Sequence, residues 1–281
     1  MNPKFWPLTL FGLLLLCGCA GAVRRSEGKS ALSISLKEAS KFAEKLGYTN
    51  SYATVDRTGN GDRLFIQFKD HSGTYRVAIV SADGILVKEL PGQSRLNDDA
   101  KPVFWLNEPA QTVQFATGYV LPTNTHTLNF ISDGRFVAMF DSRRSWIADV
   151  ESPMEELVDF TEKPMIRKIV SYGDTLHVFL KGQPERQPRP DGWAVLKRYE
   201  YKLSDGKAHL AKIQDFTFTW GVLEFDPETG LMIARSWDDM FPRAWLVNTK
   251  TEHRERFGFI RGYRFFLKDP VIQRFQQVMA D

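Results

Sequence analysis

Short runs of mainly apolar residues, separated by turn sequences, constrain the fold of this chain more than any other feature. Runs such as 64–68, 76–80 and 136–140 are rich in β-branched and aromatic residues, which favour strands. The residues between the runs are typical of tight hairpin turns: Ser72-Gly73, Asp83-Gly84, Asp133-Gly134, Gly173-Asp174, Ser204-Asp205-Gly206 and Pro227-Glu228-Thr229-Gly230. Many short strands joined by short turns predict an antiparallel meander and an all-β fold.

Two segments of the chain are similar to each other. Residues 134–140 and 144–152 align with residues 230–236 and 243–251, so that Trp146 aligns with Trp245. A copy that begins at Gly173 lies half-way between them, which gives a repeat of about 48 residues, near the size of a propeller blade. Residues 61–84 form another unit, and residues 101–126 are the least regular. We expect Trp146 and Trp245 to be equivalent buried residues on different blades.

This repeat resembles β-propellers of the WD-repeat kind, in which each blade is a four-stranded meander with a tryptophan on its third strand. The resemblance covers roughly residues 50–268, although the Trp-Asp pair itself occurs elsewhere in the unit, as Trp237-Asp238. It implies a small β-propeller of about five four-stranded blades, with residues 261–267 closing the ring. The alternative is a β-sandwich or barrel in which the hairpins are similar by chance.

Helical patterns flank the predicted strands. Ser35-Leu36-Lys37-Glu38 has the form of a capping box, and the apolar residues that follow share one helical face as far as Gly47. We therefore expect an N-terminal amphipathic helix at 35–47. Asp269-Pro270 is a helix start before Val271, Phe275 and Val278, which predicts a short C-terminal helix.

The N-terminus has the pattern of an export signal. Lys4 precedes an apolar stretch, residues 5–16, that is too short for a membrane-spanning helix. Leu16-Cys17-Gly18-Cys19 resembles the lipobox of bacterial lipoprotein precursors, in which a small residue precedes the lipidated cysteine. The resemblance implies a signal peptide at 1–18 and lipid attachment at Cys19; the alternative is a plain secretory signal cut near Ala20 or Ala22. Residues 19–32 are then a flexible tether, and residues 33–281 a single propeller-like domain.

Charge and cysteine content narrow the classes of function. The 37 basic and 34 acidic residues give a net charge of only +3, too little for a dedicated nucleic-acid binder, so no nucleic-acid partner is expected. The mature chain would retain only the lipidated Cys19, which leaves no disulfide and no thiolate site. Ala20 stands where the enteric pattern places the aspartate that retains lipoproteins at the inner membrane. This favours the outer membrane, with the domain facing the periplasm.

The sequence holds no recognisable metal, cofactor or catalytic motif. Its histidines lack metal-ligand spacing and are expected to be surface or core residues: His71, His126, His177, His209 and His253. Asp56, Thr58, Asn60 and Gly61 occupy the first positions of a calcium loop, but Gln67 stands where a bidentate glutamate is needed. A turn is the better interpretation. We expect no metal, no cofactor and no catalytic residue that the sequence can identify.

One pair of loops is a candidate ligand face. The loops follow equivalent strands of two repeats and contain Arg143 in one and Trp237, Asp238 and Phe241 in the other. In a propeller, loops that follow equivalent strands of different blades lie at the same face. Exposed aromatic and charged side chains there could contact a glycan or a peptide. The alternative is that Trp237 and Phe241 pack between blades.

Two hypotheses for function follow. The first is a lipid-anchored, non-enzymatic binding or scaffolding module of the bacterial cell envelope, held at the membrane by its lipid, with another envelope protein or a glycan as partner. The second is an envelope hydrolase or lyase that acts on glycan or peptide through carboxylates from different blades. A carboxylate cluster or a histidine at the propeller mouth would favour the enzyme, and an apolar or aromatic-basic face would favour binding.

Overall fold

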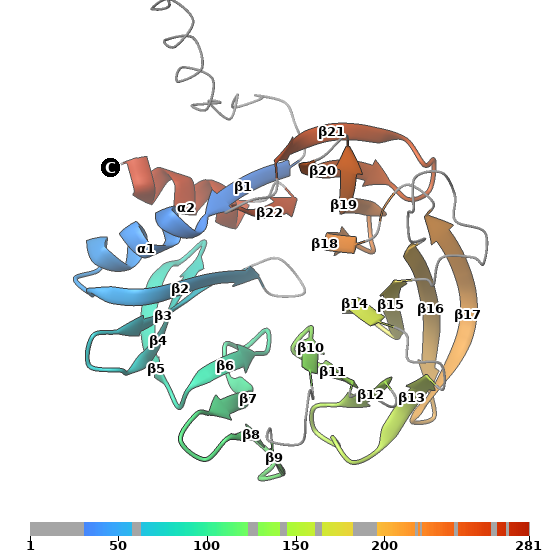
Figure 1. Ribbon diagram of the computed structural model, residues 1–281, viewed down its shortest axis with the longest axis horizontal. Coiled ribbons are helices and arrows are strands. Elements are labelled where there is room, and N and C mark those ends of the chain that lie inside the picture. The colour runs from blue at the N-terminus through green and yellow to red at the C-terminus, as the bar shows by residue number, and fades with distance from the viewer. Residues whose placement is uncertain are drawn as a thin grey trace, which may run out of the picture.

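The protein is a five-bladed β-propeller with a short helix at each end of the fold (Figure 1). The computed structural model describes residues 31–57, 63–122, 129–140, 145–160, 165–181, 196–216, 219, 221–238, 241–259, 263–267 and 270–280. Five antiparallel sheets of four strands each follow one another around a ring, and every sheet keeps its strands in chain order. The all-β expectation of about five four-stranded blades is confirmed, and the sandwich or barrel alternative is wrong.

Each blade is a run of consecutive strands. Blade 1 contains β2 (Asn50–Arg57), β3 (Leu64–Asp70), β4 (Tyr75–Ser81) and β5 (Gly84–Leu90). Blade 2 contains β6 (Gln93–Leu96), β7 (Pro102–Asn107), β8 (Thr112–Phe115) and β9 (Val120–Pro122). Blade 3 contains β10 (Asn129–Ser132), β11 (Phe136–Phe140), β12 (Ser145–Asp149) and β13 (Glu156–Phe160). Blade 4 contains β14 (Met165–Tyr172), β15 (Thr175–Lys181), β16 (Leu196–Ser204) and β17 (Lys207–Phe216). Blade 5 contains β18 (Gly221–Asp226), β19 (Leu231–Asp238), β20 (Phe241–Asn248) and β21 (Arg254–Phe259).

Apolar clusters fill the interfaces between successive blades. Blades 2 and 3 share Phe115 and Met139, blades 3 and 4 share Ile147 and Leu176, and blades 4 and 5 share Phe179 among other buried residues. β3 and β15, the second strands of blades 1 and 4, are buried on both faces, because each face packs against a different neighbour. This double burial explains why such strands are continuous apolar runs in the sequence.

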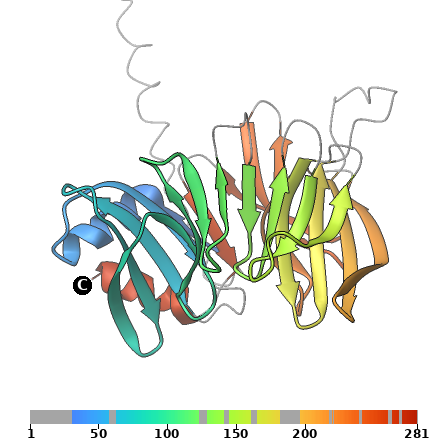
Figure 2. The same cartoon turned by 90° about the horizontal axis from the view of Figure 1, so that it is seen from below.

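The two chain ends close the ring. β1 (Ala31–Ser35) pairs antiparallel with β22 (Tyr263–Leu267) in a separate two-stranded sheet, and β22 contacts β18 and β19 of blade 5. α1 (Leu36–Lys45) packs on β2 and β3, and α2 (Pro270–Ala280) packs on β4, so both helices lie beside blade 1 (Figure 2). We call β1, β22, α1 and α2 together the seam. β22 thus closes the ring as expected of this segment, but with β1, which begins inside the predicted tether.

Contacts between the helices hold the seam together. The rings of Phe42 in α1 and Phe275 in α2 lie 5.1 Å apart, and both residues are buried. Lys45 Nζ donates to the carbonyl oxygens of Val278 and Met279, at 3.1 and 3.4 Å, near the C-terminal end of α2. A cation at this end also interacts favourably with the helix dipole.

The capping box expected at the first helix is present. Ser35 Oγ accepts a hydrogen bond from the backbone N–H of Glu38 at 3.0 Å, and the backbone N–H of Ser35 donates to Glu38 Oε2 at 2.6 Å. These bonds satisfy backbone groups that a helix N-terminus otherwise leaves unpaired.

The two repeat tryptophans occupy equivalent positions, but they are half-buried rather than buried. Trp146 pairs with Met139 across β11 and β12, and Trp245 pairs with Ala234 across β19 and β20. Each indole packs against the cluster that its blade shares with the preceding blade. The equivalence is therefore correct and the extent of burial is wrong.

The sequence alignment of the preceding strands is wrong by one residue. It matches Gly134 with Gly230, yet Arg135 separates Gly134 from β11, whereas Gly230 directly precedes β19. Because side chains alternate between the faces of a strand, a slip of one residue assigns each one to the wrong face. The structure places Met139, not Ala138, on the face equivalent to that of Ala234.

Candidate functional site

The predicted ligand-face residues fall into two groups. Trp237 and Asp238 end β19, and Phe241 begins β20, with Asp238 and Phe241 as direct partners in the register. Arg143 lies outside the described residues, and so does the predicted lipid-attachment residue Cys19. Three of the four ligand-face residues therefore belong to one hairpin end of blade 5.

The predicted calcium-like turn leads into contacts between blades 1 and 2. Asp56 forms an ion pair with Arg95 of β6. Gln67 is buried, and its Oε1 accepts a hydrogen bond from the backbone N–H of Ser94 at 3.3 Å. Residues 58–62 lie outside the described residues. Among the residues that the structure describes, no three His, Cys, Asp or Glu side chains lie together in a way that suits a metal ion. Asp56 and Gln67 thus connect two blades.

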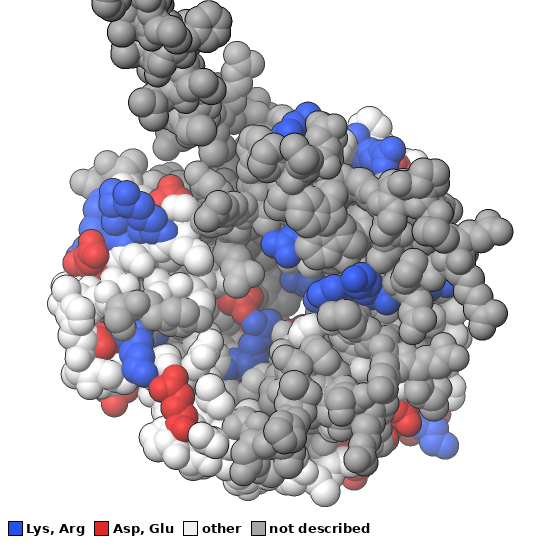
Figure 3. All heavy atoms as spheres, viewed as in Figure 1, with Lys and Arg blue, Asp and Glu red and all other residues white. Residues whose placement is uncertain are grey.

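Charged residues occur on the inner strands of the ring. Figure 3 shows Lys and Arg side chains around the middle of one face, with acidic side chains next to some of them. In β14 the register shifts at Arg167, which marks a bulge, and burial lowers the pKa of this guanidinium. The next residue, Lys168, donates from Nζ to the carbonyl oxygen of Leu223 in β18 at 2.9 Å. This bond joins the inner strands of blades 4 and 5.

A buried polar cluster lies between blades 4 and 5. His177 and Arg198 both contact the ring of Phe225. The centroids of the His177 and Phe225 rings lie 5.2 Å apart, and Arg198 Cζ lies 5.2 Å from the centroid of the Phe225 ring. Arg198 donates to Gln214 Oε1 at 2.7 Å and to Thr249 Oγ1 at 3.4 Å. Burial, with a smaller contribution from the positive charge of Arg198, lowers the pKa of His177 to about 4. His177 is thus a neutral core histidine near pH 7.

Three of the remaining histidines are exposed: His71, His209 and His253. His126 lies outside the described residues.

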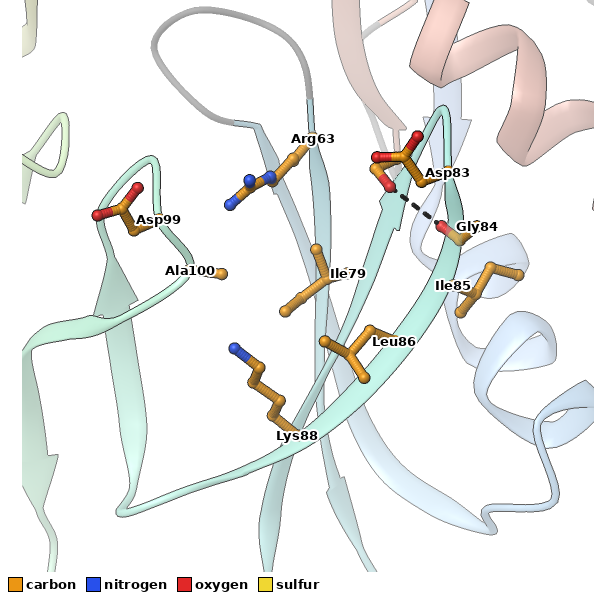
Figure 4. A pocket seen from close by; sticks show the side chains of 10 residues that line it. Arg63, Ile79, Asp83, Gly84, Ile85, Leu86, Lys88, Asp99 and Ala100 are labelled. Atoms are coloured by element: carbon orange, nitrogen blue, oxygen red, sulfur yellow. Dashed lines mark hydrogen bonds between the residues drawn. The ribbon is translucent and has the colours of Figure 1, made fainter.

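A pocket of about 430 Å³ opens where blade 1 meets blade 2 (Figure 4). Ile79 and Leu86 pair across β4 and β5, and Val77 pairs with Lys88. Since Val77 and Ile79 belong to the core shared with blade 2, Leu86 and Lys88 lie on that same face of blade 1. The remaining lining residues are Arg63, Ser81, Asp83, Gly84, Ile85, Asp99 and Ala100.

The blade 2 wall of the pocket is a tight turn between β6 and β7. Asn97 Oδ1 accepts hydrogen bonds from the backbone N–H groups of Asp99 and Lys101, both at 3.0 Å. These bonds hold Ala100 at φ 60°, a left-handed conformation that is uncommon for alanine. Across the pocket, an Nη of Arg63 donates to the carbonyl oxygen of Asp98 at 2.8 Å. The pocket wall is therefore fixed by hydrogen bonds on both blades.

No sequence motif marks this pocket. Its residues come from three separate segments, and each segment is an ordinary strand or turn in the sequence. The turn signal at Asp83-Gly84 is the single local feature that pointed to part of it. The pocket can be recognised only once the register of β4 and β5 and the position of blade 2 are known.

Neither helix of the described chain is long and apolar enough to span a membrane. No family model and no curated protein matches the sequence.

Solved structures with a similar fold include propellers of different function. The β-propeller domain of the Trilobed protease from Pyrococcus furiosus has 16% sequence identity, with 73% of this chain and 71% of that chain covered and a TM-score of 0.39. A putative TolB from Agrobacterium tumefaciens has 12% identity, covers 77% and 83%, and has a TM-score of 0.44. An oligogalacturonate lyase from Vibrio parahaemolyticus has 11% identity, covers 75% and 82%, and has a TM-score of 0.37. The likeness extends to the propeller fold and to no particular function.

Proposed function

We propose that the protein is a lipid-anchored binding or scaffolding module of the bacterial cell envelope, located at the outer membrane and facing the periplasm. The lipobox-like sequence that ends at Cys19 supports the anchor. Strand β1 begins near the end of the predicted tether and is paired within the seam. An anchor at Cys19 would therefore hold the ring at a defined point of its circumference. Another envelope protein or a glycan remains the proposed partner of such a module.

The pocket between blades 1 and 2 is the observation that carries the binding function. Its volume of about 430 Å³ falls within the range of roughly 300–1,000 Å³ that is usual for small-molecule sites. Its lining combines a few charged side chains with the apolar Ile79, Leu86 and Ala100. The contacts of Asp56 with Arg95 and of Gln67 with Ser94 hold the two blades together. A preformed site of this kind loses little conformational entropy when it binds a ligand.

A fragment screen by ligand-observed NMR tests the pocket. The purified full-length protein is compared with the Leu86→Trp variant, in which a larger side chain fills the pocket. Leu210→Trp is the matched control, because Leu210 lies on β17 of blade 4 and is 52% exposed against 53% for Leu86. We expect a set of fragments to bind the wild type and Leu210→Trp but not Leu86→Trp. A screen in which filling the pocket removes no ligand would contradict the proposal.

A further inference from the structure

We infer that the pocket between blades 1 and 2 binds a small carboxylate with an apolar group, whose carboxylate lies at Lys88 and whose apolar group covers Ile79 and Leu86. The inference rests on the proposed binding function and adds a small-molecule ligand to the envelope protein or glycan proposed as the partner of the module. Three observations carry it: the position of Lys88, the exposed apolar wall, and the distribution of the other charges.

Lys88 supplies the charge that attracts an anion. Its side chain projects from β5 into the pocket, and its ammonium group lies at the end of the pocket away from Asp83 (Figure 4). Lys88 is exposed, and within the described part of the chain it makes no hydrogen bond and no ion pair. An anion at this end would gain a charge-assisted hydrogen bond without breaking an existing one.

The apolar wall next to Lys88 favours a ligand with a hydrophobic part. Leu86 is 53% exposed, although it lies on the face of blade 1 that turns toward blade 2. Beside it, Ile79 and Ala100 are only 6% and 4% exposed, and both belong to the core between the two blades. A ring or a short alkyl chain at this place would remove the Leu86 side chain from water, which is favourable in proportion to the buried apolar area.

The other charged side chains restrict the anion to the Lys88 end. Arg63 lies at the opposite end of the pocket, in the same region as Asp83 and Asp99 (Figure 4). Its guanidinium is held there by the carbonyl oxygen of Asp98. Asp99 Oδ2 also lies 3.8 Å from Lys101 Nζ. A carboxylate at this second end would meet two like charges, whereas at Lys88 it meets a cation beside an apolar surface.

Two probes of nearly the same shape, one an anion and one neutral, test this ligand class. Binding of phenylacetate and of the neutral phenylacetamide to the purified full-length protein is measured by calorimetry and ligand-observed NMR. We expect phenylacetate to bind more tightly, and Lys88→Gln to weaken its binding about three- to fivefold while leaving phenylacetamide unchanged. Lys212→Gln is the matched control, because Lys212 is an exposed lysine on β17, away from the pocket.

The outcomes separate this inference from the proposed function. If both probes bind equally and Lys88→Gln weakens neither, the anion assignment is wrong. The same conclusion follows if phenylacetate fails to bind while fragments from the screen do occupy the pocket. In both cases the proposed function is still supported if some fragments bind the wild type and fail to bind Leu86→Trp. If filling the pocket displaces no ligand at all, the proposed function fails together with the inference.

Discussion

The buried imidazole of His177 should make the stability of the propeller depend on pH. His177 is 6% exposed and lies between blades 4 and 5, with its ring nearly perpendicular to that of Phe225. Burial, and the nearby positive charges of Arg198 and Lys202, disfavour the protonated form and lower its pKa. Protonation at this position would place a charge in the interface between two blades.

The size and direction of the effect follow from the two pKa values. The pKa of His177 is about 4 in the folded protein, against an ordinary value of 6.5. Between these values the unfolded chain binds a proton that the folded protein does not, so the free energy of unfolding falls as the pH falls from 6.5 to 4. One pKa unit corresponds to about 1.4 kcal/mol, which makes the total loss at most about 3.5 kcal/mol. The contribution is fully present above pH 6.5.

Urea unfolding at a series of pH values between 7 and 4 measures this loss. We expect His177→Gln to remove most of the pH dependence in this range, even if its stability at pH 7 is lower. His209→Gln is the control, because His209 is an exposed histidine in the same blade. Carboxylates whose pKa is lowered, such as Asp70 at about 2, lose their contribution at lower pH and are the same in all variants. An unchanged slope in His177→Gln, or an NMR titration of His177 near pH 6.5, would refute the reasoning.

Three further predictions concern the seam, a turn and the leader. Phe275→Ala should lower the free energy of unfolding by about 3–5 kcal/mol, because it empties the contact between the two helices; an unchanged urea midpoint would argue against this role of α2. Gly134→Ala should destabilise the protein more than Gly206→Ala does. Both glycines have positive φ, but a Cβ at Gly134 would lie 2.8 Å from the Leu96 carbonyl oxygen, whereas a Cβ at Gly206 would meet no atom within 4 Å. The cost at Gly206 should be about 1 kcal/mol, and equal thermal shifts would contradict the close approach. Cys19→Ser should abolish incorporation of labelled fatty acid and Cys17→Ser should not; continued acylation of the Cys19 variant would show that the lipid is attached elsewhere.

Local features of the fold could be predicted from the sequence because their causes are local. The turn Asp205-Gly206 has positive φ at both residues, 54° and 71°, as a two-residue hairpin turn of type I′ requires. The capping box of α1 likewise involves only residues of its first turn. Turn chemistry and the short apolar runs together predicted a meander, and the repeat length predicted about five blades without fixing their number.

Features that depend on packing between distant segments could not be predicted in the same way. No local signal in residues 31–35 shows that they pair with residues 263–267, so this part of the tether was not expected to form a strand. The half-burial of Trp146 and Trp245 depends on how closely the preceding blade approaches. The pocket at Lys88 depends on a turn of blade 2 that closes one side of a blade 1 hairpin.

The pairing of β1 with β22 also has a consequence for the order in which the molecule is completed. Each blade consists of consecutive strands and can form from its own stretch of chain, whereas β1 must wait for a partner close to the last residue. Contacts between segments so far apart in sequence form late, because a long loop has to close first. A chain that emerges from its N-terminus therefore keeps β1 unpaired until residues 263–267 have been synthesised. A product truncated before residue 263 would retain all five blades but leave β1 as an unpaired edge, open to aggregation and proteolysis.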